Sequence, residues 1–381
     1  MKPNDRSGTM ARRDRVSRYF PRHLLLYPFL LVLLAACGDS PQEPSQKTLD
    51  LAQPWAVAAP ADVGMDSGDL TVATERAKAI SRCMSLLVAR HGKLVLEEYF
   101  HGNRADSLND VRSVTKSVVS TLVGVALAEG FIGNLDETLG DYLPPRVAVL
   151  DSARQSISIR HLLTMTSGFQ WDESGGFGSY IKWLYSDDHI RYLLDQPLVD
   201  KPGTRFNYNS AAVHLLGVLL QEAARMPLPE FADTYLFRKI GIARSHWDPL
   251  TRGYVNGGAG IDLRPRDLAR LGQFFLQNGS SGGRQILPND WVKQATTPRF
   301  DWRSAYGPLR KYTYGYLWWL EEGQAEPAYL AWGFGGQFIY VVPALDLVVV
   351  STTRWQGLTD AGPVTKNVLD VIVNLVVPAA R

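Results

Sequence analysis

The sequence predicts an α+β fold, in which one antiparallel sheet is built from the N- and C-terminal parts of the chain and carries an inserted, mostly helical lobe. Three observations lead to this fold class. Two apolar runs within residues 85–100 surround a turn, helical patterns dominate about 150–295, and β-rich runs return between 314 and 352. Strands at both ends of a helical middle favour a sheet made from the two ends.

Each expected element has a local signal. The first two strands flank His91-Gly92, a pair typical of a hairpin turn. Residues 113–132 are apolar on nearly all sides, which predicts a buried helix. Helical patterns follow in the middle of the chain, for example at 160–165 and 267–278. Three late runs rich in β-branched and aromatic residues predict strands, and a last run predicts a helix: 314–320, 329–333, 338–352 and 364–377. We expect a binding cleft between the sheet and the helical lobe.

The bulk composition excludes several classes of function. The 381 residues include 45% hydrophobic and 20% charged residues, as in ordinary globular proteins. The formal net charge of +2 provides no field for binding nucleic acid. The sequence has no Cys/His spacing typical of a metal site, so we expect neither a metal nor a cofactor.

The N-terminus has the pattern of an export signal. Basic residues precede an apolar run from Leu24 to Ala36, which is too short to span a bilayer but suits a signal peptide. Small residues before Cys37 resemble the lipobox of bacterial lipoproteins, in which the cysteine becomes acylated. The alternative is a buried apolar helix followed by an incidental cysteine. Gly38 favours the outer membrane, because the Asp common in inner-membrane lipoproteins is missing.

These signals predict three parts of the chain. Residues 1–36 are the expected signal peptide, and the polar, proline-containing residues 37–54 are the expected flexible tether. Residues 55–378 are the expected folded domain, held by its lipid at the membrane of the cell envelope and facing the periplasm. Only one cysteine, Cys83, remains after acylation, so the domain has no internal disulfide.

Ser113 and Lys116 form an S-x-x-K motif at the start of the expected buried helix. The four letters alone are weak evidence, because Ser179 and Lys182 form a second match. Residues three apart share one face of a helix, so the hydroxyl and the amine can meet. Burial disfavours the charged ammonium, and a neutral lysine can accept the serine proton. Free N–H groups at the helix start can stabilise an oxyanion.

Competing motifs fail these tests. The match at Ser179 follows a glycine-rich run and opens no buried helix, so it predicts a polar surface turn. The run 279–283 matches the G-x-S-x-G nucleophile elbow, but that elbow needs a preceding strand, and a helix precedes it here. It therefore predicts a Gly/Ser turn. The run 333–338 lacks the last glycine of a dinucleotide-binding motif.

Taken together, the motifs resemble a known family. Ser113-Val-Thr-Lys116-Ser resembles the nucleophile motif of class C β-lactamase-like serine hydrolases, within the penicillin-recognising superfamily. Further segments resemble the family in the same order along the chain: Ile159–Gly168, Pro202–Ala211, Tyr254–Gln273 and Trp332–Leu347. The resemblance runs from about residue 54 to 378. It is nearest to the esterase and nylon-oligomer amide hydrolase branch.

The resemblance implies roles for individual residues. Ser113 would be the nucleophile, Lys116 its basic partner and Tyr208 the relay of a proton to the leaving group. The oxyanion hole would combine the backbone N–H groups of Ser113 and Phe334. For Tyr208, the alternative is an aromatic residue of the core.

Two departures from the family pattern concern substrate recognition. The family has Asn at the third position of Tyr-x-Asn, where this chain has Ser210. The family also has Lys-Thr-Gly or His-Thr-Gly on the edge strand. This motif aligns with Ala331-Trp332-Gly333, to within one or two residues, and this chain has no cation there. Ser210, Trp332 and Gly333 are therefore candidate substrate-binding residues. Four tryptophans could line the cleft or pack in the core: Trp171, Trp183, Trp318 and Trp319.

The sequence therefore predicts a lipid-anchored serine hydrolase that cleaves a small-molecule ester or amide through an acyl-enzyme. A β-lactamase or D-alanyl carboxypeptidase activity is an alternative within the same resemblance. A further alternative is a catalytically silent envelope protein that binds peptide or peptidoglycan in the same cleft. The presence of Ser113, Lys116 and Tyr208 together argues against the silent protein, since binding alone needs none of them.

Overall fold

The structure is a computed structural model, and it describes residues 48–173 and 178–380. The expected signal peptide and Cys37 lie outside the described residues. An eight-stranded antiparallel sheet has the order β2-β1-β13-β12-β11-β10-β9-β8. Its strands are β1 (Cys83–Arg90), β2 (Lys93–Tyr99), β8 (Ser304–Tyr306), β9 (Leu309–Tyr314), β10 (Trp319–Glu321), β11 (Ala328–Gly333), β12 (Gln337–Val342) and β13 (Leu347–Thr353).

The described residues also contain twelve α-helices and two small sheets. The helices are α1 (Ser67–Ala79), α2 (Val114–Ala128), α3 (Leu139–Tyr142), α4 (Ser152–Gln155), α5 (Ile159–Leu163), α6 (Gly178–Leu184), α7 (His189–Leu194), α8 (Ser210–Ala224), α9 (Leu228–Ala232), α10 (Pro265–Leu276), α11 (Trp291–Ala295) and α12 (Gly362–Val371). The small sheets contain β3 (Asn109–Asp110), β5 (Ile261–Leu263) and β4 (His246–Trp247), and β6 (Ser280–Ser281) with β7 (Arg284–Gln285).

The large sheet joins the two ends of the chain, which confirms the predicted α+β fold. The N-terminal strand β1 pairs with the C-terminal strand β13 along its whole length. The β1–β2 hairpin turns at His91 and Gly92, whose φ angles are 49° and 70°. Glycine adopts such left-handed angles readily, as a tight hairpin turn requires.

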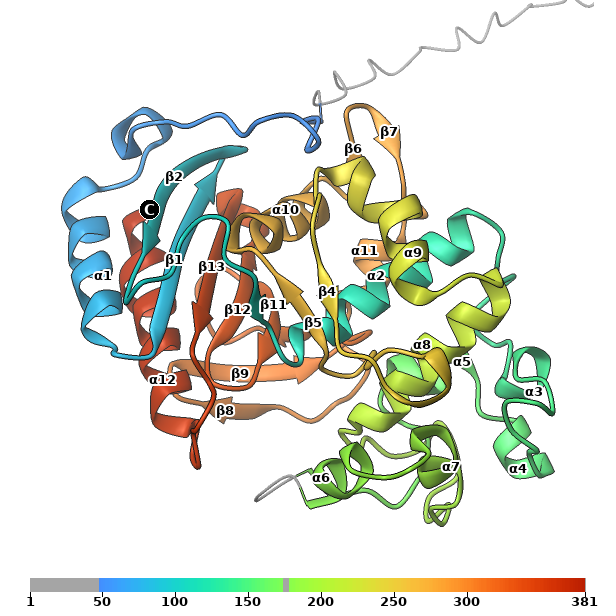
Figure 1. Ribbon diagram of the computed structural model, residues 1–381. Coiled ribbons are helices and arrows are strands. Elements are labelled where there is room, and N and C mark those ends of the chain that lie inside the picture. The colour runs from blue at the N-terminus through green and yellow to red at the C-terminus, as the bar shows by residue number, and fades with distance from the viewer. Residues whose placement is uncertain (1–47, 174–177, 381) are drawn as a thin grey trace, which may run out of the picture. The chain divides into compact units, whose positions relative to one another are not determined.

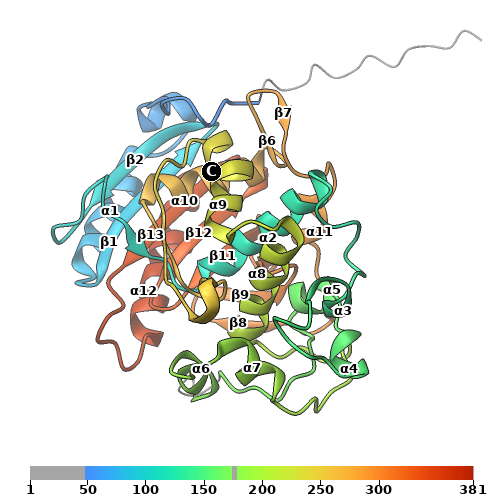
Figure 2. The same ribbon diagram turned by 45° about the vertical axis from the view of Figure 1, so that its right-hand side comes forward.

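Helices cover both faces of the large sheet (Figures 1 and 2). On one face, α1 and α12 pack against apolar side chains of the strands and form one hydrophobic core. On the other face, α10 and α2 belong to the second, larger core, which continues into the helical lobe. Gly272 of α10 lies so close to the strands that an added Cβ would stand 2.5 Å from a methyl group of Val348.

The boundaries differ from the sequence prediction in two places. Helix α10 falls within the range expected for the inserted lobe, yet it covers the sheet, because its strongly one-sided apolar stripe faces β12 and β13. Residues 48–54 belong to the folded unit. Leu51 is buried and its N–H donates to Ser281 Oγ at 3.0 Å, while Thr48 Oγ1 accepts from Gly283 N–H at 2.9 Å. The mostly polar composition of residues 37–54 gave no sign that Leu51 is buried.

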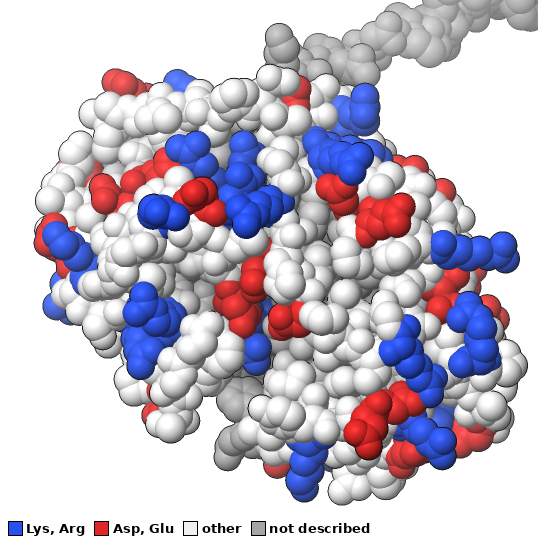
Figure 3. All heavy atoms as spheres, in the orientation of Figure 1, with Lys and Arg blue, Asp and Glu red and all other residues white. Residues whose placement is uncertain are grey.

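Among the described residues, one helical stretch, 362–380, is long and apolar enough to cross a membrane by length and composition. Core helices also meet that test, and this stretch packs on the sheet beside α1 with 56% of its apolar window buried. Charged side chains of both signs are mixed over the face in Figure 3, in keeping with the small net charge. The electrostatics of this face therefore favour no polyanion.

Candidate active site

Ser113 stands directly before α2, and Lys116 lies one turn inside it. The Lys116 Nζ atom is 2.8 Å from Ser113 Oγ. Thirteen of the fifteen residues of α2 are buried, and Lys116 itself is 1% exposed. Burial lowers the pKa of Lys116 from 10.5 to about 7; a nearby Glu173 charge opposes this effect and the Arg112 charge adds to it. The structure thus brings together the predicted pair and supplies the expected desolvation.

The residue before Ser113 adopts a strained backbone. Arg112 has a φ of 51°, a left-handed conformation that a residue with a Cβ rarely adopts. Such strain costs about 1–3 kcal/mol and persists only where the surroundings hold it. Here Asp110 Oδ1 accepts the Arg112 N–H at 3.0 Å, and the guanidinium lies 4.3 Å from the ring centre of Trp355. The sharp turn places Ser113 at the N-terminus of α2.

The carbonyl oxygen of Gly258 is the second partner of Lys116. It lies 2.7 Å from Nζ, and the side chain of Asn256 fixes the loop by accepting the N–H groups of Gly258 and Ala259, each at 3.1 Å. A Cβ on Gly258 would stand 2.4 Å from the carbonyl oxygen of Ser210, so this close approach requires glycine. Sequence reasoning assigned no role to Gly258, although the glycine-rich run 257–260 signals such an approach.

Tyr208 lies beside both members of the pair. Its ring centre is 4.8 Å from Lys116 Nζ, and its hydroxyl forms a hydrogen bond with Ser113. Trp319 stacks on the ring with a centroid distance of 6.0 Å. Burial raises the pKa of Tyr208 well above its ordinary value, and the Glu173 charge raises it further. The hydroxyl therefore stays protonated at neutral pH and can donate a proton.

Glu173 is a site residue that sequence reasoning missed. Its carboxylate accepts the backbone N–H of Ser210 at 2.7 Å, the Ser210 hydroxyl at 2.9 Å and the indole N–H of Trp171 at 2.7 Å. Ser210, the departure from Tyr-x-Asn, thus binds a carboxylate. Glu173 is 37 residues from Ser210 in sequence, and no local motif marks it.

The end of β11 lies against the segment that precedes Ser113. A Cβ on Gly333 would stand 2.2 Å from the carbonyl oxygen of Val111, so only glycine permits this contact. The Phe334 ring is 6.3 Å from that of Trp355, which also covers Arg112. Phe334 thus follows directly on the glycine that contacts Val111, and its role as an oxyanion donor stays a prediction.

Trp332 belongs to an aromatic group at the end of the sheet. Ala331 is fully buried in the core that contains α2, whereas Trp332 is half-buried and packs toward the opposite core. Rings of four residues surround Trp332 at centroid distances of 5.0 to 6.3 Å: Tyr306, Tyr312, Trp319 and Phe338. Through Trp319, this group adjoins Tyr208. Ala331-Trp332-Gly333 therefore contributes bulk rather than a cation.

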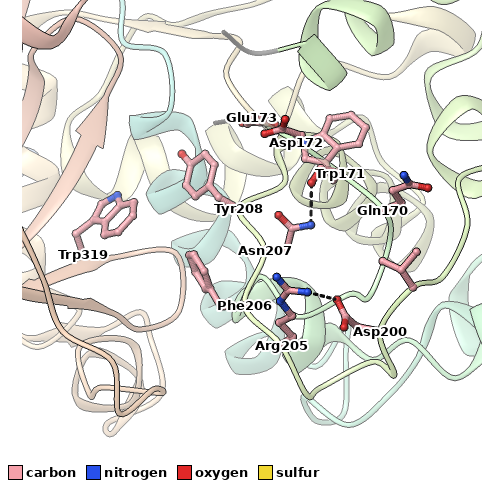
Figure 4. A pocket seen from close by; sticks show the side chains of 11 residues that line it. Gln170, Trp171, Asp172, Glu173, Asp200, Arg205, Phe206, Asn207, Tyr208 and Trp319 are labelled. Carbon is pink, nitrogen blue, oxygen red and sulfur yellow. Dashed lines mark hydrogen bonds and ion pairs between the residues drawn. The ribbon is translucent and has the colours of Figure 1, made fainter. Parts of the chain in front are cut away.

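A cavity of about 650 Å³ opens between the helical lobe and β10, where the sequence predicts a cleft (Figure 4). Tyr208 and Trp319 form one wall. Trp171 and Glu173 lie on the lobe side, and Trp183 and Trp318 are buried in the core instead. The cavity is lined by Gln170, Trp171, Asp172, Glu173, Val199, Asp200, Arg205, Phe206, Asn207, Tyr208 and Trp319.

The competing motifs lie elsewhere. Ser179 and Lys182 are in the short helix α6, so the predicted surface turn is wrong; Lys182 is exposed and lacks the desolvation that would neutralise it. The run 279–283 forms the β6–β7 hairpin, as the Gly/Ser turn prediction requires. Within residues 48–173 and 178–380, no group of three or more His, Cys, Asp or Glu side chains is arranged to hold a metal ion.

Comparisons with known proteins identify the family. The Beta-lactamase family model matches residues 71–371. The chain is 26% identical over 300 residues to the 6-aminohexanoate-dimer hydrolase of Paenarthrobacter ureafaciens, covering 72% of this chain and 73% of that protein. It is 30% identical over 178 residues to Esterase EstB of Burkholderia gladioli, covering 41% and 44%.

Solved structures share the fold. The Beta-lactamase/D-alanine Carboxypeptidase of Yersinia pestis, complexed with citrate, matches with a TM-score of 0.65 and 22% identity, covering 83% of this chain and 98% of that one. The family match extends over most of the chain, from α1 to α12. The chain therefore belongs to the beta-lactamase family of serine hydrolases.

Proposed function

We propose that this serine hydrolase cleaves uncharged esters or amides through an acyl-enzyme on Ser113. The observation that carries the proposal is the 2.8 Å approach of Lys116 Nζ to Ser113 Oγ in a buried setting. Because burial lowers the pKa of Lys116 to about 7, a substantial fraction of the amine is neutral at physiological pH. A neutral amine at this distance can accept the serine proton.

The proposed reaction has two halves. Lys116 takes the Ser113 proton as Oγ bonds to the substrate carbonyl carbon, and the N–H groups of Ser113 and Phe334 bind the oxyanion. Tyr208 then donates its proton to the leaving oxygen or nitrogen and regains one from Lys116, while the bond to the leaving group breaks. Water attacks the acyl-enzyme by the reverse proton route and releases the acid. The cavity beside Tyr208 would receive the leaving group.

The aromatic group around Trp332 supports the substrate class. Relatives that act on β-lactams or D-alanyl peptides bind a carboxylate beside a cation on the edge strand, and Ala331-Trp332-Gly333 supplies none. The oxyanion donors are backbone groups, so acyl transfer does not depend on that cation. We therefore favour uncharged esters over β-lactams. A β-lactamase or carboxypeptidase activity, as in the name of the Yersinia pestis enzyme, is the second candidate.

A silent binding protein fits the site less well. Desolvating Lys116 disfavours folding, and a protein that only binds a ligand gains nothing from a lysine with a lowered pKa. The strained Arg112 adds a second cost at the same place. Both features are expected of a reacting serine.

The nucleophile can be tested by trapping. A fluorophosphonate probe should add to the wild-type protein at Ser113 and raise its intact mass by one adduct. Ser113→Ala should remove the adduct and lower kcat on p-nitrophenyl acetate by several orders of magnitude, because catalytic units of this kind fail as a whole. Ser179→Ala, in the second S-x-x-K match, is the control and should react like wild type. Full labelling of Ser113→Ala would exclude Ser113 as the nucleophile.

We further propose that the enzyme is anchored at the cell envelope by a lipid on Cys37 and faces the periplasm. The support is the order of a basic region, an apolar run and small residues before Cys37. The outer membrane is favoured by Gly38.

A further inference from the structure

The carboxylate of Glu173 is fixed in one position by donors from two segments. The indole N–H of Trp171 comes from its own segment, and the N–H and hydroxyl of Ser210 come from the first residue of α8. A carboxylate at a helix N-terminus is favoured by the free N–H groups and by the helix dipole. Glu173 therefore ties the segment 171–173 to the start of α8.

This tie acts on the catalytic array through the chain itself. Tyr208 precedes Ser210 by two residues, and Asn209 between them caps α8 by accepting the Ala212 N–H at 2.9 Å. Any shift of the first turn of α8 would therefore move the Tyr208 hydroxyl away from Ser113. Glu173 thus holds the position of Tyr208 without touching the reacting atoms.

Glu173 also acts through its charge. Its carboxylate favours the protonated forms of both Lys116 and Tyr208, whereas the Arg112 guanidinium acts in the opposite direction on each. Lys116 thus lies in the fields of one anion and one cation, each held by the fold. The other groups in this electrostatic set are two buried phenols: Tyr180, which acts on Tyr208, and Tyr314, which responds to Tyr208 and Glu173.

We infer that Glu173 is a positioning residue of the active site, which holds Tyr208 beside Ser113 and keeps a fixed negative charge next to Lys116. It acts through Ser210, which stands where the family pattern has the amide of Tyr-x-Asn and donates both its N–H and its hydroxyl to Glu173. The inference rests on the proposed function, because it concerns the proton transfers of that reaction.

The test is the pH profile of kcat/KM on p-nitrophenyl acetate. Activity needs neutral Lys116, so the wild-type profile should fall below about pH 7. Glu173→Gln removes the charge that opposes deprotonation of Lys116, so its acid limb should move to lower pH while kcat drops at least tenfold. Glu173→Asp keeps the charge but shortens the reach, so kcat should fall while the acid limb stays at the wild-type pH.

Asp200→Asn is the matched control for charge. Asp200 lines the same cavity but pairs with Arg205 at 3.8 Å, so its removal should leave the acid limb in place. Thermal unfolding of each variant checks that it folds. If the wild type is active and Glu173→Gln keeps the wild-type acid limb, this inference is wrong and the proposed function stands. A wild type that hydrolyses no ester would overturn the proposed function, and this inference with it.

Discussion

The burial of Lys116 works against folding near neutral pH. The unfolded chain holds a proton on this lysine up to about pH 10.5, whereas burial lowers the folded pKa to about 7. Between these values the unfolded state binds more protons, so the stability contributed by this residue rises with pH and is lowest below pH 7. The difference between the two pKa values corresponds to about 5 kcal/mol of lost stability at pH values below 7.

Replacing Lys116 by Met should therefore stabilise the protein at pH 7 and abolish catalysis. The gain is smaller than 5 kcal/mol, because the Gly258 carbonyl loses its partner at a cost of about 1–3 kcal/mol. Urea unfolding at pH 7 and pH 10 measures the difference in the free energy of unfolding between variant and wild type. This difference should be smaller at pH 10. Ser113→Ala, which retains the lysine, is the control. If the difference in the free energy of unfolding does not change with pH, Lys116 stays charged when buried.

The same residues show what sequence reasoning can and cannot reach. Ser113 and Lys116 were predictable because their interaction lies within one helical turn of an apolar helix. Glu173 was not predictable, since its partner Ser210 is brought to it only by the folding of the lobe. Gly258 reaches Lys116 across 142 residues, and its glycine-rich run marks only a close backbone approach.

At the level of elements, β11 is the strand that we propose selects the substrate. Its last residues lie against the segment before Ser113, where an added Cβ on Gly333 would meet Val111. The strand thus needs glycine at this end whatever side chain precedes it. Trp332 is half-buried and packs against Trp319, which in turn stacks on Tyr208, so position 332 is linked to the site through Trp319.

Short-chain p-nitrophenyl esters should exceed nitrocefin and benzylpenicillin in kcat/KM, and Trp332→Lys should narrow that gap. A charge-assisted hydrogen bond to a substrate carboxylate contributes about 1.5–3 kcal/mol, so a new cation that reaches this carboxylate should raise kcat/KM for benzylpenicillin by about one to two orders of magnitude. Trp332→Gln removes the ring without adding a charge, so it separates the effect of losing the indole from the effect of gaining a cation. Efficient penicillin turnover by the wild type, with negligible ester cleavage, would show that the carboxylate site comes from another element.

For the whole molecule, the pattern of strands and helices was sufficient to predict the sheet but not the limits of the folded unit. Runs of β-branched residues and the alternation of apolar and polar residues depend only on neighbours in the sequence. The strands at both ends of the chain could therefore be predicted. The contacts of residues 48–54 depend on Leu51 and on the distant β6–β7 hairpin, which no local pattern reports. A shortened form for assays should therefore begin at residue 48 or earlier, rather than at Trp55.

The anchor is tested on the full-length protein in cells. Cys37→Ala should abolish incorporation of labelled palmitate and leave the protein unprocessed or released from the membrane fraction. Cys83→Ala is the matched control, since Cys83 is buried and should not affect labelling. Equal palmitate labelling of Cys37→Ala and wild type would exclude the proposed lipidation site. Activity of the released domain should persist, because the residues of the proposed site lie between Ser113 and Phe334, far along the chain from Cys37.

The wide separation of the site residues has a practical consequence. Lys116 takes its hydrogen-bond partners from Ser113 and Gly258, and it is an ordinary charged lysine until folding has brought these segments together and buried it. A nascent or partly unfolded chain should therefore carry an unreactive Ser113, because a charged lysine cannot accept the serine proton. Conversely, only the folded protein should be labelled covalently at Ser113. The amount of labelled protein therefore measures the folded fraction, even in a crude extract where spectroscopy cannot.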